Sequence, residues 1–432
     1  MADAAIFDTD VLIPASIVDT ITDPGAYADD RIYAAYAWLR KNNPLGLARK
    51  DGFRPFWVVT RHADIMEISR RNDVFHAGAT NNTFIDEAGA QRVLELNNGS
   101  PHLVASIVSM DLPVHPVYRA LTQGWFMPAN IKKREGEIRT IARRAVDRMA
   151  AMGGRCDFVA DLALGYPLHV IMNIFGVPEE DERVMLKLTQ ELFGPQDPDI
   201  TGEGKTLSAN EYADYLAKTV QGFEAYFKNL SEARRREPRD DLASVIANAK
   251  VDGKQIGQRE EFGYYITVAT AGHDTTSTST AAAMWELAAN PAEFEKVKAN
   301  PALIPQLVDE GIRWATPIKH FMRSAIADVE YGGRTFKAGD WIMLCYGSGN
   351  RDEAVFDQPD VFKADRSPNK HISFGYGPHL CLGQHLARME MRILFEELLP
   401  RLKSVTLDGQ PTRSKSWFIN GPKTVPIRFE MS

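Results

Sequence analysis

Apolar positions along the chain recur mostly at the three- to four-residue spacing of amphipathic helices. This periodicity predicts helices over 23–42, 63–70, 179–193, 209–236 and 384–399. Runs of β-branched and aromatic residues concentrate in two places, 56–60 and 326–346, and predict strands there. The pattern therefore predicts a mostly α fold with a small β region, an α+β arrangement.

The longest helical pattern runs from residue 259 to residue 290. Between Glu261 and Glu286 its only acidic or basic residues are His273 and Asp274, which is typical of a helix that crosses a protein core. The many serines and threonines argue against a membrane span. Gly272 is costly inside a helix, and hydroxyl side chains can bond back to the preceding turn, so we expect a bend near Gly272.

Two stretches lack periodicity and are predicted to be long loops, 76–110 and 192–212. Long loops in compact enzymes often carry function. Residues 1–22 are predicted to form an irregular N-terminal arm. No linker-like stretch divides the chain, so we expect a single domain over 1–432.

The composition of the chain argues against several classes of protein. Fifty basic and fifty-seven acidic residues give a net charge of −7, which argues against wholesale nucleic-acid binding. The three cysteines lie far apart, so no disulfide framework is expected and a reducing cytoplasm fits. The N-terminus has neither a basic segment nor an apolar segment, so we expect no signal peptide and no membrane anchor.

The strongest chemical signal is Phe374-Gly-Tyr-Gly-Pro-His-Leu-Cys-Leu-Gly383, directly before the helical run 384–399. Backbone N–H groups and the helix N-terminus can stabilise a thiolate at Cys381. Phe374 can shield the sulfur and His379 can donate to an anion on the same side. An axial thiolate with a nearby donor is what a haem-thiolate iron requires. The alternative is that Cys381 is a small buried apolar residue in a turn.

Two further motifs have both a chemical and a structural interpretation. His115 and Arg119 lie four residues apart, so they share a helix face and could donate to one anion. The alternative there is a solvated helix face. Ala271-Gly-His-Asp-Thr-Thr276 combines a distortion, a carboxylate and a hydroxyl. It is either a site for dioxygen and proton transfer or a packed bend with a satisfied aspartate.

Together these motifs resemble the cytochrome P-450 family. The resemblance is carried by F-G-x-G-x-H-x-C-x-G, A-G-H-D-T, H-x-x-x-R after D-x-P, and E-x-x-R, in the family's order, and it spans about residues 23–430. His379 stands where many members carry arginine. The runs His-Asp-Thr-Thr, Phe-Met-Arg and Asn-Arg-Asp-Glu resemble the bacterial branch that hydroxylates α-terpineol.

The resemblance implies specific roles. Cys381 would be the axial ligand of haem b, Thr275 would hydrogen-bond dioxygen, and Asp274 would relay protons. The haem would also contact Ala271, Gly272, Phe374 and His379, and its propionates would bind His115, Arg119 and Arg323. Substrate contacts would come from Ile318, Phe321 and Phe418. Glu310, Arg313 and Arg366 would form a structural network that fixes the Cys381 loop.

The implied function is a soluble, cytoplasmic monooxygenase that hydroxylates a small hydrophobic substrate, a monoterpenoid or alkyl-aromatic. Electrons would come from NAD(P)H through a reductase and a [2Fe-2S] ferredoxin, with basic residues of 131–134 and 143–144 as possible contacts. A monomer is expected. Three alternatives remain at this stage: a peroxide-driven hydroxylase, a larger fatty-acid or sterol substrate, and a non-catalytic haem sensor or electron carrier.

Overall fold

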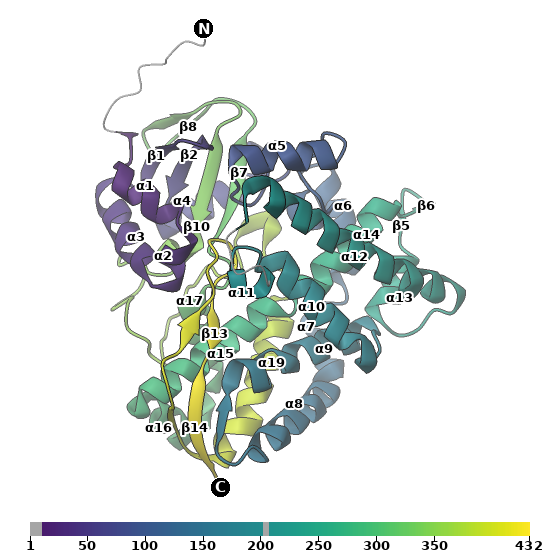
Figure 1. Ribbon diagram of the computed structural model, residues 1–432, viewed down its shortest axis with the longest axis vertical. Coiled ribbons are helices and arrows are strands. Elements are labelled where there is room, and N and C mark those ends of the chain that lie inside the picture. Colours follow the sequence, from purple (N-terminus) through teal and green to yellow (C-terminus); the bar gives the residue numbers. More distant parts are fainter. Residues whose placement is uncertain (1–10, 202–206) are drawn as a thin grey trace.

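A computed structural model describes residues 11–201 and 207–432. The main sheet lies at the upper left in Figure 1, smaller pairs of strands lie elsewhere, and helices make up most of the molecule. This arrangement confirms the predicted mostly α fold with a small β region.

The main sheet joins the two strand-rich stretches that the sequence predicts. In the described part of the chain it has five strands, in the order β1 (Leu45–Lys50), β2 (Phe53–Val59), β10 (Trp341–Cys345), β7 (His320–Ala325) and β3 (Phe75–His76). β2 and β10 pair in parallel, with Trp57 opposite Ile342, and the other neighbours are antiparallel. Strands almost three hundred residues apart thus share one sheet.

The remaining strands form smaller sheets. β11 (Leu402–Leu407), β14 (Pro426–Met431) and β4 (Arg155–Asp157) lie near the C-terminus (Figure 1). Three two-stranded sheets pair β5 (Lys250–Val251) with β6 (Lys254–Gln255), β8 (Val329–Tyr331) with β9 (Arg334–Phe336), and β12 (Thr412–Arg413) with β13 (Pro422–Thr424).

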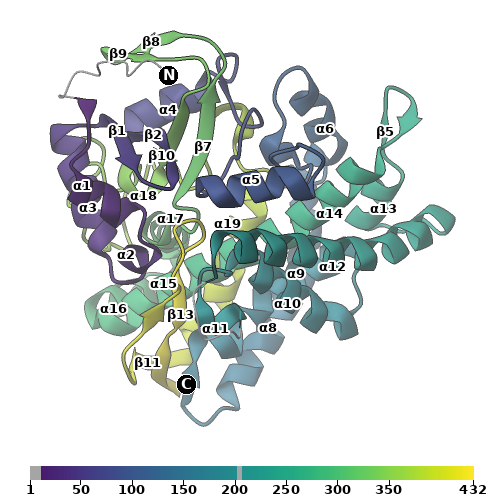
Figure 2. The same cartoon turned by 45° about the horizontal axis from the view of Figure 1, so that its top comes forward.

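Three helices lie beside the main sheet (Figure 2): α1 (Ala15–Ile21), α3 (Arg31–Asn42) and α4 (His62–Arg70). α2 (Pro24–Ala28) packs against α1, α3 and β12. α1 corrects the prediction of an irregular arm, because Val18 and Ile21 are buried and hold 15–21 as a helix; residues 1–10 of that arm lie outside the described residues. The predicted helix over 23–42 is two helices, because Asp30 adopts a left-handed conformation with φ of 65° and redirects the chain.

The helical body follows in chain order: α5 (Glu87–Leu96), α6 (Val114–Gln123), α7 (Pro128–Ile131), α8 (Glu135–Ala150), α9 (Gly165–Phe175), α10 (Glu182–Phe193), α11 (Pro198–Thr201), α12 (Ala209–Arg236), α13 (Leu242–Ala247), α14 (Gln258–Ala271), α15 (Asp274–Ala289), α16 (Pro291–Ala299), α17 (Ile304–Ala315), α18 (Tyr346–Gly349) and α19 (Gln384–Leu398). Short 3-10 or π turns complete it: η2 (Ile107–Ser109), η3 (Lys132–Arg134), η4 (Val159–Ala163), η5 (Glu179–Asp181), η6 (Pro301–Leu303), η7 (Gly377–His379) and η8 (Leu399–Arg401).

The two predicted loops are partly helical. Within 76–110, α5 forms because the Asp86 carboxylate accepts the Gly89 N–H and caps its first turn. α5 packs along α12, which lies beside it in Figure 2. Within 192–212 the chain forms α11, and residues 202–206 of that predicted loop lie outside the described residues.

The predicted long helix crosses the centre of the molecule but is interrupted. α14 ends at Ala271 and α15 begins at Asp274, so the expected bend near Gly272 is a break between two helices. α15 packs against α17 and is part of the largest apolar core. Within the residues that the structure describes, no helix has both the length and the apolarity needed to cross a membrane.

Candidate active site

The Cys381 loop is held by its own backbone and requires glycine. The Cys381 N–H donates to the Phe374 carbonyl at 2.8 Å. Gly375 and Gly377 have φ of 73° and 72°, a region that side chains disfavour. A Cβ on Gly377 would also come within 2.7 Å of the Ser69 carbonyl oxygen, so the loop lies directly against the end of α4.

Two opposing effects act on the Cys381 thiol. Burial raises its pKa, while the backbone N–H groups of Gly383 and Gln384 and the guanidinium of Arg119 favour the thiolate. On the other side of the loop, the Arg388 guanidinium lies 4.5 Å from the centre of the Phe374 ring. Gly383 differs from the earlier glycines, because its φ is −85° and a Cβ there would meet no atom within 4 Å. The loop therefore borders open space beside the sulfur.

Cationic and hydrogen-bond-donating side chains from three elements meet next to this loop. His115 and Arg119 come from α6, Arg323 from β7 and His379 from η7. The His115 and His379 rings lie 4.3 Å apart, and an Arg119 Nη2 group donates to the Leu380 carbonyl at 2.6 Å. Burial and then the nearby cations, Arg323 first, lower the pKa of His379 to about 2.

This cluster lacks the acceptors that its donors require. The Nε2 atoms of His115 and His379 are both buried and have no hydrogen-bond partner in the described part of the chain. Buried polar atoms are rarely left unpaired, and two arginines nearby add positive charge. An anionic group with several oxygens, such as the propionates of a haem, would satisfy all four side chains. With the Cys381 thiol beside them, the residues fit a haem.

The break between α14 and α15 borders the same space. Ala271, Gly272 and Thr275 line the cavity, and the Thr275 hydroxyl donates to the Ala271 carbonyl at 2.9 Å. A Cβ on Gly272 would come within 2.7 Å of Ile171, so α9 packs tightly against the break. Asp274 does not line the cavity; burial raises its pKa, and the neighbouring His273 opposes that rise.

An apolar wall completes the cavity, which has a volume of about 330 Å³. Ile318, Phe321 and Phe418 all belong to this wall, and the rings of Phe321 and Phe418 lie 5.5 Å apart. Ile318 also forms an isolated β-bridge with Ile419, which brings the C-terminal turn to the wall. The structure thus gathers all the predicted site residues except Asp274 around one cavity.

Sequence reasoning missed several lining residues. Phe193, at the end of α10, lines the cavity and lies 6.3 Å from the Phe418 ring. Ser106 and Ile171 line it as well. The apolar end of the 179–193 helix next to a polar segment was a usable signal for Phe193. Nothing in the sequence pattern distinguishes Ser106 or Ile171 from ordinary loop and core residues.

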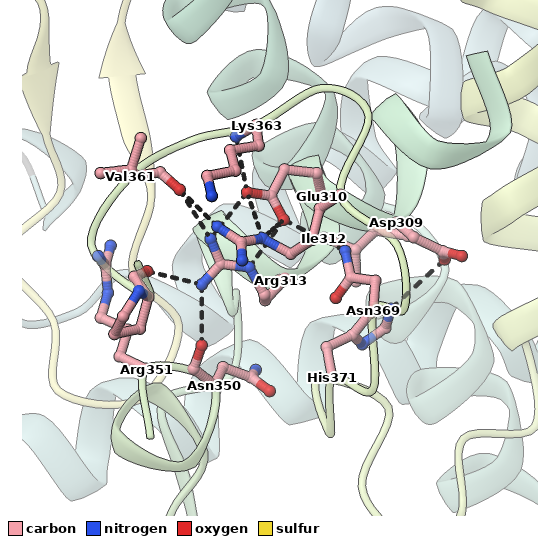
Figure 3. A network of polar contacts seen from close by, with 12 residues as sticks. Asp309, Glu310, Ile312, Arg313, Asn350, Arg351, Val361, Lys363, Asn369 and His371 are labelled. Carbon is pink, nitrogen blue, oxygen red and sulfur yellow. Dashed lines mark hydrogen bonds and ion pairs between the residues drawn. The ribbon is translucent and has the colours of Figure 1, made fainter. Parts of the chain in front are cut away.

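A buried ion network joins α17 to the 363–369 segment, which precedes the Cys381 loop in the chain (Figure 3). Glu310 and Arg313, on α17, form a bidentate pair at 2.7 and 2.8 Å, and the Arg366 Nε group donates to both Glu310 oxygens. The Asn369 amide also donates to Glu310 at 3.2 Å. Both side chains of the Glu310–Arg313 pair are fully buried. This geometry agrees with the predicted network of three residues.

The chain is similar to known proteins over nearly its whole length. The cytochrome P450 family model matches residues 205–429. The chain is 47% identical to cytochrome P450-terp of a Pseudomonas species over 424 residues, which cover 98% of this chain and 99% of that protein. It is 29% identical to linalool 8-monooxygenase of Pseudomonas putida, over 94% and 98% of the two chains. The crystal structure of CYP108D1 from Novosphingobium aromaticivorans superposes with a TM-score of 0.90 at 44% identity, covering 98% of this chain and all of that one. The chain therefore belongs to the cytochrome P450 family of haem-thiolate monooxygenases.

Proposed function

We propose that this monooxygenase hydroxylates a small hydrophobic substrate, a monoterpenoid or an alkyl-aromatic compound, with Cys381 as the axial ligand of its haem. The observation that carries the proposal is the apolar cavity that opens onto the Cys381 loop. Extended similarity to cytochrome P450-terp and linalool 8-monooxygenase supports a terpene-like substrate. α-Terpineol is therefore the first compound to test.

The cavity wall favours a compact hydrocarbon with one polar group. Most of the lining is aliphatic or aromatic, and Asn82, Thr83 and Ser106 add polar atoms. The Ser106 hydroxyl accepts the Val108 N–H at 3.2 Å, which leaves its own hydrogen for a ligand. The side chains of Asn82 and Thr83 form no hydrogen bond to another described residue. A substrate hydroxyl is the kind of group that such a set recognises.

In this proposal, Thr275 and Asp274, at the break between α14 and α15, deliver protons to the cavity. Haem bound beside Cys381 supplies the redox-active iron that activates dioxygen. The Thr275 hydroxyl, which donates to the Ala271 carbonyl, presents its lone pairs to the cavity and can accept a hydrogen bond there. Asp274 is the neighbouring acid, and burial keeps its carboxyl protonated to a higher pH than usual.

Electrons are proposed to come from a [2Fe-2S] ferredoxin and its NAD(P)H-dependent reductase. The predicted basic surface is only partly available, because Arg134 pairs with Glu137 and Asp240, and Arg143 pairs with Glu397. Lys132, Lys133 and Arg144 are exposed and form no ion pair with another described residue. These three cations are the ones that an acidic partner would reach.

The test is a visible spectrum of the purified haem protein. Reduction under carbon monoxide should give the red-shifted band of thiolate ligation, and Cys381→Ala should abolish it. Titration with α-terpineol or p-cymene should convert the ferric iron from low to high spin. A spin change with cholesterol or a long-chain fatty acid, and none with the small compounds, would contradict the substrate class. Turnover driven equally well by hydrogen peroxide would contradict the ferredoxin requirement.

A further inference from the structure

A second, much smaller cavity lies where α3, α15, α17 and the C-terminal turn meet. Its volume is about 20 Å³, and it shares no lining residue with the haem cavity. Lys319 and Asn420 line it, and they directly follow Ile318 and Ile419, the two residues of the β-bridge at the wall of the larger cavity. The Lys319 N–H donates to the Phe418 carbonyl at 2.9 Å. The small cavity is therefore next to the segments that form the apolar wall.

Positive charge dominates the lining of this small cavity. Three cationic side chains reach it, those of Lys319, Arg351 and Arg413. Lys319 is only 3% exposed, and its ammonium group donates to the Ala315 carbonyl at 2.7 Å but forms no ion pair with a described residue. Glu286 is the one carboxylate among the described lining residues, and burial raises its pKa. A buried ammonium without a counter-charge is unfavourable, so the site favours a further negative charge.

The two arginines are only partly neutralised from outside the cavity. Arg351 pairs with Asp360 at 3.0 Å, and Arg413 pairs with Asp30 at 2.8 Å. The two carboxylates are 68% and 44% exposed, so solvent screens their charge. Each pair uses one nitrogen of a guanidinium that has five N–H donors. The remaining donors form no hydrogen bond to another described residue and can bind a ligand in the cavity.

Aromatic rings position these guanidinium groups. That of Arg351 lies 4.0 Å from the centre of the Tyr33 ring and 4.2 Å from that of the Trp314 ring. That of Arg413 lies 4.3 Å from the centre of the Trp285 ring. Stacking on a ring face restricts a planar cation. Both cations are thus held in place before a ligand binds, which lowers the entropic cost of binding.

Tyr33 responds to the positive charge of this site. Its hydroxyl lies 3.4 Å from Lys319 Nζ. Burial by itself would raise the pKa of the Tyr33 phenol, but Lys319 and Arg351 lower it to about 8, with Arg413 acting in the same direction and Asp30 against it. A phenolate at Tyr33 would supply the missing negative charge, and so would a bound anion.

We propose that this cavity binds one small monovalent anion of halide size, in contact with the Lys319 ammonium and the guanidinium groups of Arg351 and Arg413. Its volume of about 20 Å³ slightly exceeds the roughly 10–15 Å³ that one water needs, so gluconate or sulfate does not fit. The anion balances the buried charge of Lys319 and so stabilises the chain beside the apolar wall. This inference does not depend on which substrate the enzyme oxidises.

Anomalous diffraction from crystals of the haem-loaded protein grown in sodium bromide tests the site directly. We expect a bromide peak in contact with Lys319 Nζ in the wild type, and no peak there in Lys319→Met. Lys41→Met, at an exposed position of α3, is the matched control and should keep the peak. A water molecule at this position without an anomalous peak would overturn the proposal.

A titration in solution separates this site from binding at crystal concentration only, and needs no turnover. In gluconate, one tyrosine should titrate near pH 8, and Tyr33→Phe should lack this component. Chloride competes with the phenolate for the same cations, so chloride at ten times its Kd should raise this pKa by about one unit. Lys319→Met should remove the chloride effect.

Two results of the titration would overturn the proposal. A Tyr33 phenol that titrates near its ordinary value of 10.0 in gluconate would show that the charge of the site is already balanced. A pKa near 8 that chloride does not change would show that no anion binds in solution, and a bromide peak in the crystal would then reflect binding at crystal concentration only.

Discussion

His320 joins three segments that are distant in sequence. Its Nδ1–H donates to the Trp417 carbonyl at 2.9 Å, and its Nε2 accepts the Phe84 N–H at 3.1 Å. Both nitrogens are thus used, and the ring is neutral and fully buried. Burial lowers the pKa of His320 to about 4, against an ordinary value of 6.5. Protonation would add a hydrogen where the Phe84 N–H already donates.

We predict that stability falls with acidification between about pH 6.5 and pH 4. Above 6.5 His320 is neutral in both the folded and the unfolded chain. Below pH 6.5 the unfolded chain binds a proton at His320 and the folded chain does not. The free energy of unfolding therefore decreases as the pH falls, until the pH is below the pKa of His320 in the folded chain. The shift corresponds to about 3 kcal/mol from this residue. Urea unfolding of the haem-loaded protein across this range measures it.

The control is His320→Gln, whose amide can donate and accept but does not titrate. Its unfolding free energy should be lower at neutral pH and should depend less on pH than that of the wild type. An identical pH dependence in both proteins would show that other buried groups cause the acid sensitivity.

Single residues were predictable where several special types cluster in a short motif. The positions of Cys381 with its glycines and of Thr275 at one cavity agree with the prediction, because few other roles require such combinations. Their chemical roles stay predictions, as does that of Asp274. Partner atoms supplied by distant backbone were not predictable. The Leu164 carbonyl that orients His273, and the Ile171 side chain that requires Gly272, are set by how α9 packs, which no local pattern records.

At the scale of elements, α17 and the 357–369 segment are connected through one carboxylate. Glu310 receives Arg313, Arg366, Asn369 and the Lys363 N–H. Arg313 in turn donates to backbone carbonyls outside α17, including that of Asn350 at 2.9 Å. The network therefore fixes the chain that leads into the Cys381 loop.

We predict that Glu310→Gln destabilises the protein by roughly 3–5 kcal/mol, because it leaves two buried guanidinium groups without a counter-charge. Chemical unfolding monitored by circular dichroism measures the loss, and haem retention should fall with it. Glu295→Gln, an exposed position on α16, is the matched control and should change stability by less than about 0.5 kcal/mol. Equal stabilities of the two variants would contradict a supporting role for the network.

The long periodic helices α12 and α19 were predicted closely, and so was the shorter α4. The prediction was wrong where contacts with distant segments determine whether a helix forms. α1 and α5 are short, and each is stabilised by burial against another element, α1 through Val18 and α5 through Val93. Asp30 divides the predicted helix over 23–42 by a left-handed backbone that aspartate only sometimes adopts.

At the scale of the whole molecule, an ion pair ties the segment after α10 to the C-terminal strands. Lys423 Nζ, on β13, contacts both Asp197 oxygens at 2.9 and 3.0 Å and also pairs with Asp199. Asp197 is almost fully buried. The Trp417 N–H donates to the Gln196 side chain at 3.1 Å. These contacts hold together the two segments that place Phe193 and Phe418 on the cavity wall.

We predict that Lys423→Met speeds substrate dissociation roughly tenfold, because a buried Asp197 without its cation favours separation of the two segments. Stopped-flow decay of the substrate-induced spin shift measures the rate. Lys415→Met, at an exposed position of the same segment, should leave it unchanged. Adding Asp197→Asn to Lys423→Met should restore slow dissociation in part. An unaltered rate in the single variant would contradict the role of this pair.

The single-domain organisation and the monomeric state stay predictions, since they depend on cooperativity and self-association rather than on local pattern. The family was predictable because its motifs recur in order along the chain. The substrate was less predictable, because the cavity wall combines side chains from α10, β7 and the C-terminal turn, and the sequence does not show that these elements lie together.

The parallel pairing of β2 with β10 has a consequence for synthesis of the chain. β2 ends at residue 59 and its partner begins at residue 341. At typical translation rates a ribosome needs roughly 15 to 60 seconds to make the intervening segment. During that time the β1–β2 hairpin exposes Phe56, Trp57 and an unpaired strand edge, the kind of surface that nascent-chain chaperones bind. Release of the N-terminal region from such helpers must therefore wait until β10, which begins at residue 341, has emerged.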